Sequence, residues 1–342
     1  MRDSILEVNN LQVSFDIGGR DAVAVDRLSF SLGHGRTLGI VGESGSGKSI
    51  ASLAIMGLVP SPPGRISGGS IRFMGRELTG MPEHELRALR GKDISMIFQE
   101  PMTALNPVFR VGEQIAESLM VHANLDRRAA WGRAAELLAE VGIPEPELRV
   151  RNYPFELSGG MRQRVMIAIA LACAPSVLIA DEPTTALDVS VQAQIFQLLK
   201  AIQRRSGTSI LFITHDMGSI AAMTDRVIVM YAGSCVEAGS TREILLDPRH
   251  PYTQGLIACT PHLDRRAGRK KGYLHEIPGM VPAITDIGAS CAFAPRCSRA
   301  GPRCFRERPF AAAFGDGRRV ACFNADLEAA AGGRSSHGNA IA

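Results

Sequence analysis

Residues 42–49 read Gly-Glu-Ser-Gly-Ser-Gly-Lys-Ser, a glycine-rich segment that ends in a basic and a hydroxyl side chain. Its glycines allow the backbone to curl so that N–H groups surround an anion, while Lys48 attracts phosphate oxygens and Ser49 can bind Mg²⁺. An apolar run precedes the segment and a helical pattern follows it, as a phosphate-binding loop requires. We expect the whole loop to contact a nucleotide: Gly42, Glu43, Ser44, Gly45, Ser46, Gly47, Lys48 and Ser49.

Two adjacent carboxylates, Asp181 and Glu182, directly follow the apolar run 177–180. Such a run predicts a buried strand, and α/β sheets bind ligands at the carboxyl ends of their strands. Asp181 suits the coordination shell of Mg²⁺, and Glu182 is the candidate general base for an attacking water. A solvated strand end would not explain why both acids follow four apolar residues.

Gln99 and His215 follow two further predicted strands, at residues 94–98 and 209–213. We expect the Gln99 amide to reach both Mg²⁺ and the attacking water, and the His215 imidazole to touch the γ-phosphate. Phe15 lies on an early predicted strand. Its ring either stacks on adenine or packs in the core, and the sequence favours neither.

Residues 157–164 read Leu-Ser-Gly-Gly-Met-Arg-Gln-Arg and open an apolar helix predicted over residues 158–171. Small residues at a helix N-terminus bare backbone N–H groups, which attract anions. A serine-capped helix start would look the same in isolation. The position between a phosphate loop and a carboxylate pair favours an anion site held between two subunits. Asp188, soon after the carboxylates, is a candidate contact with the second subunit.

The elements that must position these residues alternate between strand and helix, which predicts an α/β core with a mostly parallel sheet. Residues 111–172 are predicted to form a helical subdomain. A hairpin is expected about Ala232 and Gly233. The predicted strands are residues 5–8, 11–15, 37–41, 70–74, 94–98, 177–180, 209–213, 226–231 and 234–238.

The chain has 342 residues, enough for one large domain with an appendage or for two domains. Its net charge of +4 is too mild to indicate a nucleic-acid-binding protein. The start of the chain shows no signal-peptide pattern, and the most apolar stretch, residues 165–180, is too short and too interrupted to span a bilayer. We therefore expect a soluble chain that reaches a membrane only through partners.

Regular periodicity fades after residue 246, which predicts a domain boundary near residues 247–250 and a small C-terminal domain to residue 328. Residues 329–342 are rich in Ala, Gly and Ser, and we expect a disordered tail. A basic run is interpreted as a solvated linker rather than as a lipid or nucleic-acid patch. It comprises Arg265, Arg266, Arg269, Lys270 and Lys271.

Four of the seven cysteines lie close to the C-terminus: Cys291, Cys297, Cys304 and Cys322. A cytosolic chain does not normally hold structural disulfides, and the spacing lacks the C-x₂₋₄-C pairs of structural zinc sites. Four thiolates can also ligate a [4Fe–4S] cluster. From the residues alone a cluster, zinc and free thiols all stay open. The other three cysteines are expected to be buried free thiols.

The order of these motifs over residues 5–238 resembles the nucleotide-binding subunits of ABC transporters. The resemblance implies a P-loop NTPase fold with a RecA-like core, an antiparallel β subdomain and a helical subdomain. It also implies ATP hydrolysis with Mg²⁺ by a head-to-tail dimer. Its motifs map onto the Walker A loop at 42–49, the Q-loop Gln99, the signature Leu157, Ser158, Gly159, Gly160 and Gln163, the Walker B Asp181 with the base Glu182, the D-loop Asp188 and the H-loop His215.

Residues 99–107, 249–253, 277–279 and 294–297 resemble the dipeptide/oligopeptide importer subfamily. This resemblance implies a second, different ATPase subunit, two membrane-spanning permease subunits and an extracytoplasmic solute-binding protein. It places the chain peripherally, at the cytoplasmic face of the membrane. Relatives also carry nickel, glutathione or opines, so the solute stays open. Some members hold a [4Fe–4S] cluster in the cysteine-containing segment, and on that ground we favour the cluster.

Two other classes of protein fit this sequence less well. A soluble ABC ATPase that acts on nucleic acid or ribosomes commonly has long coiled-coil inserts or two cassettes in one chain, and neither pattern is visible. A non-enzymatic subunit with a degenerate site is disfavoured by the presence of Glu182 and His215. The sequence therefore favours an active ATPase.

Overall fold

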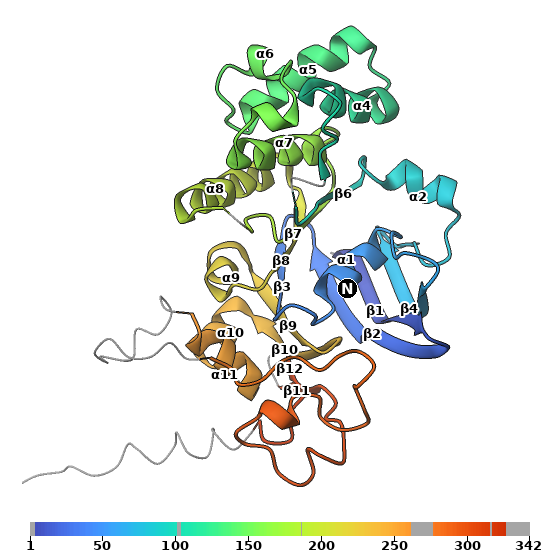
Figure 1. The fold of residues 1–342 in the computed structure, drawn as a ribbon, viewed down its shortest axis with the longest axis vertical. Helices are drawn as coiled ribbons and strands as arrows, with labels where there is room; N and C mark the ends of the chain where they lie inside the picture. The colour runs from blue at the N-terminus through green and yellow to red at the C-terminus, as the bar shows by residue number, and fades with distance from the viewer. Residues whose placement is uncertain (1–3, 101–103, 186, 261–275, 315–316, 326–342) are drawn as a thin grey trace, which may run out of the picture.

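The computed structural model describes residues 4–100, 104–185, 187–260, 276–314 and 317–325. Within these residues the strands form two sheets (Figure 1). The smaller sheet is antiparallel, in the order β2-β1-β4-β5. Its strands are β1 (Ser4–Ile17), β2 (Arg20–Gly33), β4 (Gly64–Phe73) and β5 (Arg76–Glu77).

The larger sheet runs in the order β11-β12-β10-β9-β3-β8-β7-β6. Its strands β9, β3, β8, β7 and β6 are parallel, and the rest pair antiparallel. Helices cover parallel sheets on both faces, which is why these strands read as nearly continuous apolar runs. The strands are β3 (Thr37–Val41), β6 (Ile94–Ile97), β7 (Val177–Asp181), β8 (Ser209–Thr214), β9 (Arg226–Tyr231), β10 (Ser234–Ser240), β11 (Ala312–Phe314) and β12 (Arg318–Val320).

One group of helices forms the predicted helical subdomain, at the end of the molecule away from the C-terminal region (Figure 1). It contains α4 (Val111–Ala123), α5 (Arg127–Glu140), α6 (Pro146–Arg149), the 3₁₀ turn η1 (Pro154–Glu156) and α7 (Gly159–Leu171). Their buried faces join one core cluster with the larger sheet. No helix among the described residues is long and apolar enough to cross a bilayer.

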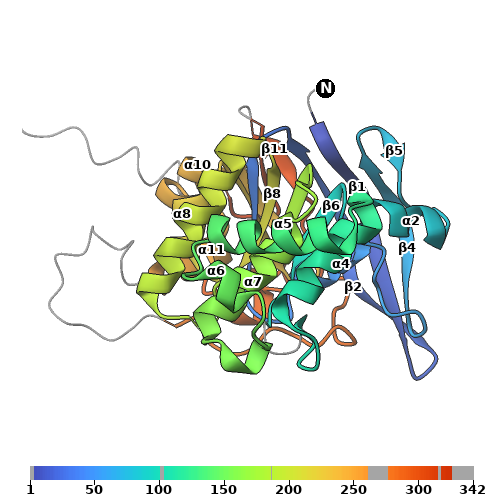
Figure 2. The same cartoon turned by 90° about the horizontal axis from the view of Figure 1, so that it is seen from above.

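The other helices flank the sheets. They are α1 (Lys48–Ile55), α2 (Glu83–Leu89), α8 (Val189–Ser206), α9 (Met217–Met223), α10 (Thr241–Leu246), α11 (Pro251–Ala258) and the 3₁₀ turn η2 (Ala294–Arg296). Seen from above, the smaller sheet and α2 lie on one side of the molecule, and α8 and α10 lie on the other (Figure 2).

The prediction of two separate strands at residues 5–8 and 11–15 was wrong. Residues 4–17 form the single strand β1, and its pairing register with β2 shifts between Val8 and Leu11. Asn10 lies there with φ 48°, a conformation that asparagine tolerates at a bulge as well as in a turn. Strand β2 was not predicted from the sequence. The hairpin of β9 and β10 about Ala232 and Gly233 is confirmed.

The region after residue 246 packs onto the larger sheet. Strand β12 pairs with β10, and Tyr252, Leu256 and Phe293 belong to the same core cluster as the sheet and the helical subdomain. Some predicted features lie outside the described residues: the basic run Arg265, Arg266, Arg269, Lys270 and Lys271, the tail 329–342 and the Q-loop residues 101–103.

A buried ion pair joins this region to the sheet. The Glu237 carboxylate is fully buried on β10 and accepts hydrogen bonds from Arg318 Nη2 at 2.9 Å and from the backbone N–H groups of Arg249 and His250 at 2.8 and 3.0 Å. Arg318 lies on β12 and is only 4% exposed. Breaking such a pair leaves a charge buried without compensation.

We therefore expect Arg318→Met to lower the free energy of unfolding by about 3–5 kcal/mol, measured by urea denaturation. The matched control is Arg133→Gln, which removes partly exposed pairs with Glu136 and Glu140 and should cost less than about 1 kcal/mol. Equal losses in both variants would contradict the prediction.

Candidate nucleotide site

The phosphate loop connects β3 to α1, and close packing requires two of its glycines, Gly42 and Gly47. A Cβ atom on Gly42 would lie 2.2 Å from the carbonyl oxygen of Met230, and one on Gly47 would lie 2.6 Å from that of Ala24. Gly47 also adopts φ 95°, a conformation that glycine reaches at no steric cost. The β9–β10 hairpin supports the loop from behind, because Gly233 N–H donates to Ser46 O at 3.0 Å.

The Lys48 ammonium is buried inside the loop, with 4% of the residue exposed. Nζ donates to the carbonyl oxygens of Gly42 at 2.7 Å and Glu43 at 3.0 Å, and it lies 4.0 Å from Glu182 Oε1. Burial lowers the pKa of Lys48, and the carboxylates of Glu182, Asp181 and Glu43 oppose that shift. The Lys48 ammonium is thus held by carbonyl oxygens of the loop, and phosphate oxygens can take the place of these carbonyls.

Asp181 ends strand β7 and is 3% exposed. Burial raises the pKa of its carboxyl, while hydrogen bonds from the Ser49 and Ser52 hydroxyls act in the opposite direction. Its Oδ1 atom is buried and has no hydrogen-bond partner among the described residues. A buried carboxylate oxygen without a partner is costly, and a hard divalent cation binds such oxygens. Asp181 with Ser49 therefore fits the predicted Mg²⁺ site.

Glu182 follows Asp181 and is the centre of a hydrogen-bond network. Its Oε2 atom accepts from Gln99 Nε2 at 3.2 Å and from Thr185 Oγ1 at 3.0 Å, and it lies 3.1 Å from His215 Nδ1. The His215 contact, the largest influence, lowers the pKa of Glu182, and the Glu182 contact raises that of His215. The carboxylate is therefore held in the ionised form that a general base needs.

The structure brings together side chains that three predicted strands carry. Gln99 follows β6, Asp181 ends β7 with Glu182 directly after it, and His215 follows β8. These strands are parallel neighbours. Thr185 was not predicted, and only its place three residues after Glu182 could have indicated it. A cleft of about 610 Å³ opens at this edge and is lined by Glu43, Ser44, Gln99, Glu182, His215, Leu256, Cys259, Glu276 and Ile277.

Four lining residues of this cleft come from the region after residue 246: Leu256, Cys259, Glu276 and Ile277. They were not predicted from the sequence, because nothing near them in the chain indicates a nucleotide site.

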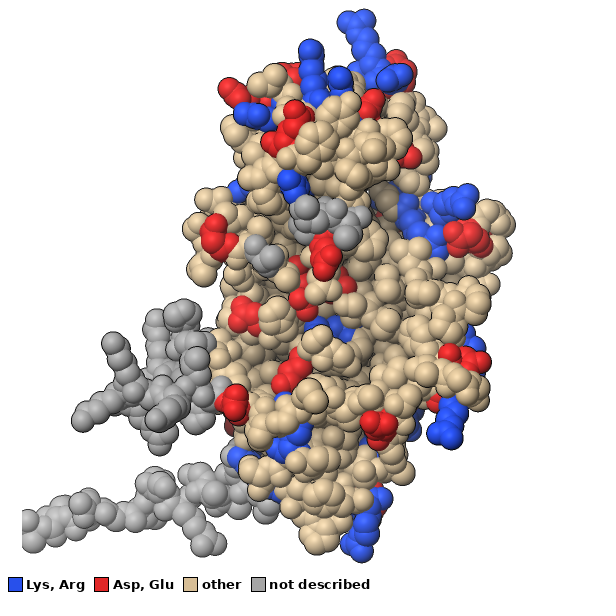
Figure 3. Space-filling model, viewed as in Figure 1, with Lys and Arg blue, Asp and Glu red and all other residues tan. Residues whose placement is uncertain are grey.

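On the face shown in Figure 3, acidic and basic side chains are interspersed rather than gathered by sign. This face therefore shows no basic stripe of the kind that tracks a nucleic-acid backbone.

The signature segment begins α7. Ser158 is the exposed N-cap and accepts a hydrogen bond from Met161 N–H at 3.3 Å, while Gly159 beside it is exposed as well. Leu157 is buried. Gln163 is only 1% exposed, and its Nε2 has no partner among the described residues. In this structure the position of Gln163 on α7 turns its side chain toward the core, and its contact with the ATP of a partner subunit stays a prediction.

Two other predicted residues have local packing roles. Asp188 is exposed and caps α8, where its side chain accepts from Val191 N–H at 2.9 Å. Phe15 is partly buried, and its ring lies beside Gly64 of the neighbouring strand β4. Part of each side chain remains accessible. The predicted contact of Asp188 with a partner subunit and that of Phe15 with adenine therefore stay predictions.

Comparison with known proteins identifies the family of this chain. Residues 25–185 match the ABC transporter family, and residues 236–304 match the oligopeptide/dipeptide transporter C-terminal region. The oligopeptide transport ATP-binding protein AppD of Bacillus subtilis is 48% identical over 96% of this chain and 98% of its own length. The oligopeptide transport ATP-binding protein OppD of Salmonella typhimurium is 50% identical over 93% of both chains.

Solved structures agree with these matches. The dimeric post-hydrolysis structure of the ATP-binding cassette MJ0796, bound to ADP and phosphate, has a TM-score of 0.63 and 27% identity. It covers 69% of this chain and 99% of that one. CbiO1 of Clostridium perfringens, part of the ABC transporter complex CbiONQ, has a TM-score of 0.61 and covers 72% and 92%. With the loop, the carboxylates and the signature in place, this chain belongs to the ATP-binding subunits of ABC transporters, in the oligopeptide/dipeptide branch.

Proposed function

We propose that this protein is the ATP-hydrolysing subunit of an importer that moves dipeptides, oligopeptides or related small solutes across the cytoplasmic membrane. The convergence of Lys48, Asp181 and Glu182 at the carboxyl end of β7 carries the proposal, because it supplies a phosphate contact, a cation site and a general base. The relatives named as oligopeptide transport proteins support the solute class. A nickel, glutathione or opine importer of the same branch is the alternative.

The proposed chemistry follows from the positions of these groups. Backbone N–H groups of residues 42–49 surround the phosphates, and Lys48 exchanges loop carbonyls for phosphate oxygens. Ser49, Gln99 and Asp181 would hold Mg²⁺, which neutralises charge on the phosphates. Glu182 takes a proton from the attacking water as the water oxygen bonds to the γ-phosphorus. The bond from that phosphorus to the β–γ bridging oxygen breaks, and ADP and phosphate are the products.

We further propose that the site is completed by a second ATPase subunit, a different chain. Ser158, Gly159 and Gly160 would present the N-terminus of α7 to an ATP held by the other subunit's phosphate loop. Asp188 would face that subunit, and Phe15 would contact adenine. The assembly includes two permease subunits and an extracytoplasmic solute-binding protein, with this chain at the cytoplasmic face of the membrane.

The proposed organisation of the chain follows the same motifs. Residues 1–246 are the ATPase region, 247–328 the C-terminal region and 329–342 a disordered tail. Shared core packing between the first two regions supports a joint role rather than an independent one.

We also propose that Cys291, Cys297, Cys304 and Cys322 ligate a [4Fe–4S] cluster with a structural role. All four are free thiols and line one small cavity, together with His250 and Phe293. Among the described residues, no three Cys, His, Asp or Glu side chains are placed to hold a single metal ion. Four thiolates are the ligand number that a [4Fe–4S] cluster takes, and the resemblance to the importer subfamily supports the proposal.

Glu182→Gln keeps the shape of the side chain but cannot accept a proton. We expect ATP binding to persist while steady-state phosphate release by the assembled transporter falls by about 10²–10⁴-fold. The control Glu136→Gln alters an exposed acid far from the cleft and should leave turnover unchanged. Normal hydrolysis by Glu182→Gln would show that another group is the base.

His215→Ala removes the largest influence that lowers the pKa of Glu182. The folded-state pKa of Glu182 should then rise, so the acid limb of the kcat–pH profile should move to higher pH. His215→Asn, which keeps a hydrogen-bond donor, should move it less. An acid limb that stays in place or moves to lower pH would refute the proposed coupling.

The cluster proposal is tested by purifying the protein without oxygen. A brown protein with near-ultraviolet to visible absorption is expected, and Cys304→Ser should lose that absorption and unfold at a lower temperature. Cys173→Ser, which changes a thiol outside the cavity, is the matched control. A colourless protein with stoichiometric zinc would exclude the cluster.

A further inference from the structure

The C-terminal region reaches the phosphate loop through one side chain. Arg296, the last residue of η2, donates from Nη1 to Glu43 Oε2 at 2.6 Å and from Nη2 to Oε1 at 3.0 Å. Its side chain is 6% exposed and that of Glu43 is 28% exposed. A bidentate pair of a guanidinium with a carboxylate fixes geometry as well as charge. The second residue of the phosphate loop is therefore held by a residue from the far end of the chain.

Arg296 is itself held in place. Nε donates to Pro278 O at 2.7 Å, and Nη2 also donates to Ile277 O at 3.2 Å. Nη1 lies 3.4 Å from the Tyr231 hydroxyl, and the guanidinium lies over the Phe293 ring. These contacts position the guanidinium before any nucleotide binds, so Arg296 is a fixed anchor rather than a mobile surface charge.

The backbone of Glu43 is held from the same region. Its N–H donates to the Tyr252 hydroxyl on α11 at 2.8 Å, and its carbonyl oxygen accepts from Lys48 Nζ at 3.0 Å. Tyr252 packs on Tyr231 and Phe293, with ring centroids 4.7 and 5.4 Å away. Side chain, N–H and carbonyl of one loop residue are thus all engaged, and two of the three contacts come from the C-terminal region.

Glu43 also lines the cleft that opens beside the phosphate loop, next to Ser44 and Glu182. A free carboxylate there would repel a triphosphate, and its interaction with Arg296 neutralises it. Loss of Arg296 would therefore have two effects on nucleotide binding. The loop would lose its fixed conformation, and the cleft would gain a negative charge.

We propose that Arg296 is a positioning residue that acts through Glu43 to hold the phosphate loop ready for ATP. The C-terminal region thereby sets the affinity of the site for the nucleotide. This inference rests on the proposed function, because it assumes that the loop binds ATP. It adds a residue and a region that the motifs of the nucleotide site do not include.

The experiment measures binding of a fluorescent ATP analogue to the full-length protein. Arg296→Gln should raise the Kd by about tenfold, as expected for loss of a charge-assisted bidentate contact. Glu43→Gln should weaken binding less, because it removes the charge that Arg296 neutralises. The double variant should bind no more weakly than Arg296→Gln alone, since both changes act on one interaction. In the assembled transporter KM should rise with kcat changed less than about twofold.

The matched control is Arg303→Gln, in the same region, where Arg303 pairs with Glu307 at 2.9 Å and is 61% exposed. Its Kd should equal that of the unmodified protein. Arg296→Lys keeps the charge without the fork geometry and should recover part of the affinity. The unfolding temperature of each variant without nucleotide reports on folding. If Arg296→Gln does not fold, the comparison of Arg296→Lys with Glu43→Gln still measures the coupling.

Unchanged affinity in Arg296→Gln and Arg296→Lys, or additive losses in the double variant, would overturn the inference. A different pattern marks failure of the proposed function: the unmodified protein would not bind the analogue, or Lys48→Ala would bind it as well as the unmodified protein does. Normal binding that depends on Lys48 but not on Arg296 would contradict only the positioning role.

Discussion

The buried ammonium of Lys48 is the constraint on which the rest of the site depends. A cation this far from water needs oxygen partners, and it finds them in two loop carbonyls, with the Glu182 carboxylate 4.0 Å away. The loop can curl around it only because Gly42 and Gly47 have no Cβ to meet neighbouring carbonyls. The carboxylates of Asp181 and Glu182 balance the charge of Lys48. Both lie at the carboxyl end of β7, so this strand must lie beside the loop.

The same charge balance explains the arrangement around Glu182. Gln99, Thr185 and His215 all approach one oxygen of the carboxylate, which leaves the other oxygen facing Lys48. A carboxylate so surrounded stays ionised. The parallel order of β6, β7 and β8 is what brings these groups to one edge.

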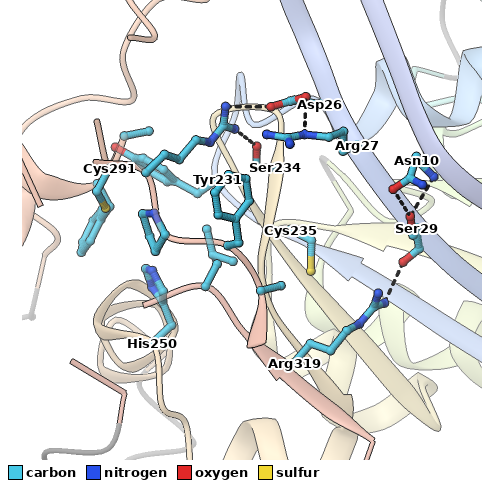
Figure 4. Close-up of a pocket in the computed structure, with 18 residues that line it drawn as sticks. Asn10, Asp26, Arg27, Ser29, Tyr231, Ser234, Cys235, His250, Cys291 and Arg319 are labelled. Atoms are coloured by element: carbon cyan, nitrogen blue, oxygen red, sulfur yellow. Dashed lines mark hydrogen bonds and ion pairs between the residues drawn. The ribbon is translucent and has the colours of Figure 1, made fainter. Parts of the chain in front are cut away.

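The C-terminal region is continuous with this core. Tyr231, His250 and Cys291 line a pocket at its junction with β1 and β2, where Arg308 pairs with Asp26 at 2.7 Å (Figure 4). Burial lowers the pKa of His250 to about 3, so its ring is neutral at this junction. The aromatic contacts between Tyr231 and Phe293 extend from this junction toward Arg296. Packed side chains thus connect the cavity of the four cysteines with the phosphate loop.

The sequence by itself determined the parts that depend on local pattern: the loop, the buried strands β3, β7 and β8, the hairpin, and the side chains that follow each strand. Short-range signals failed where one residue type suits two local structures, as Asn10 suits both a turn and a bulge. Only the tertiary structure decided that Arg296 meets Glu43 and that His250 borders the cavity of the four cysteines. Such contacts depend on how whole elements pack, and residue types near either partner do not record that packing.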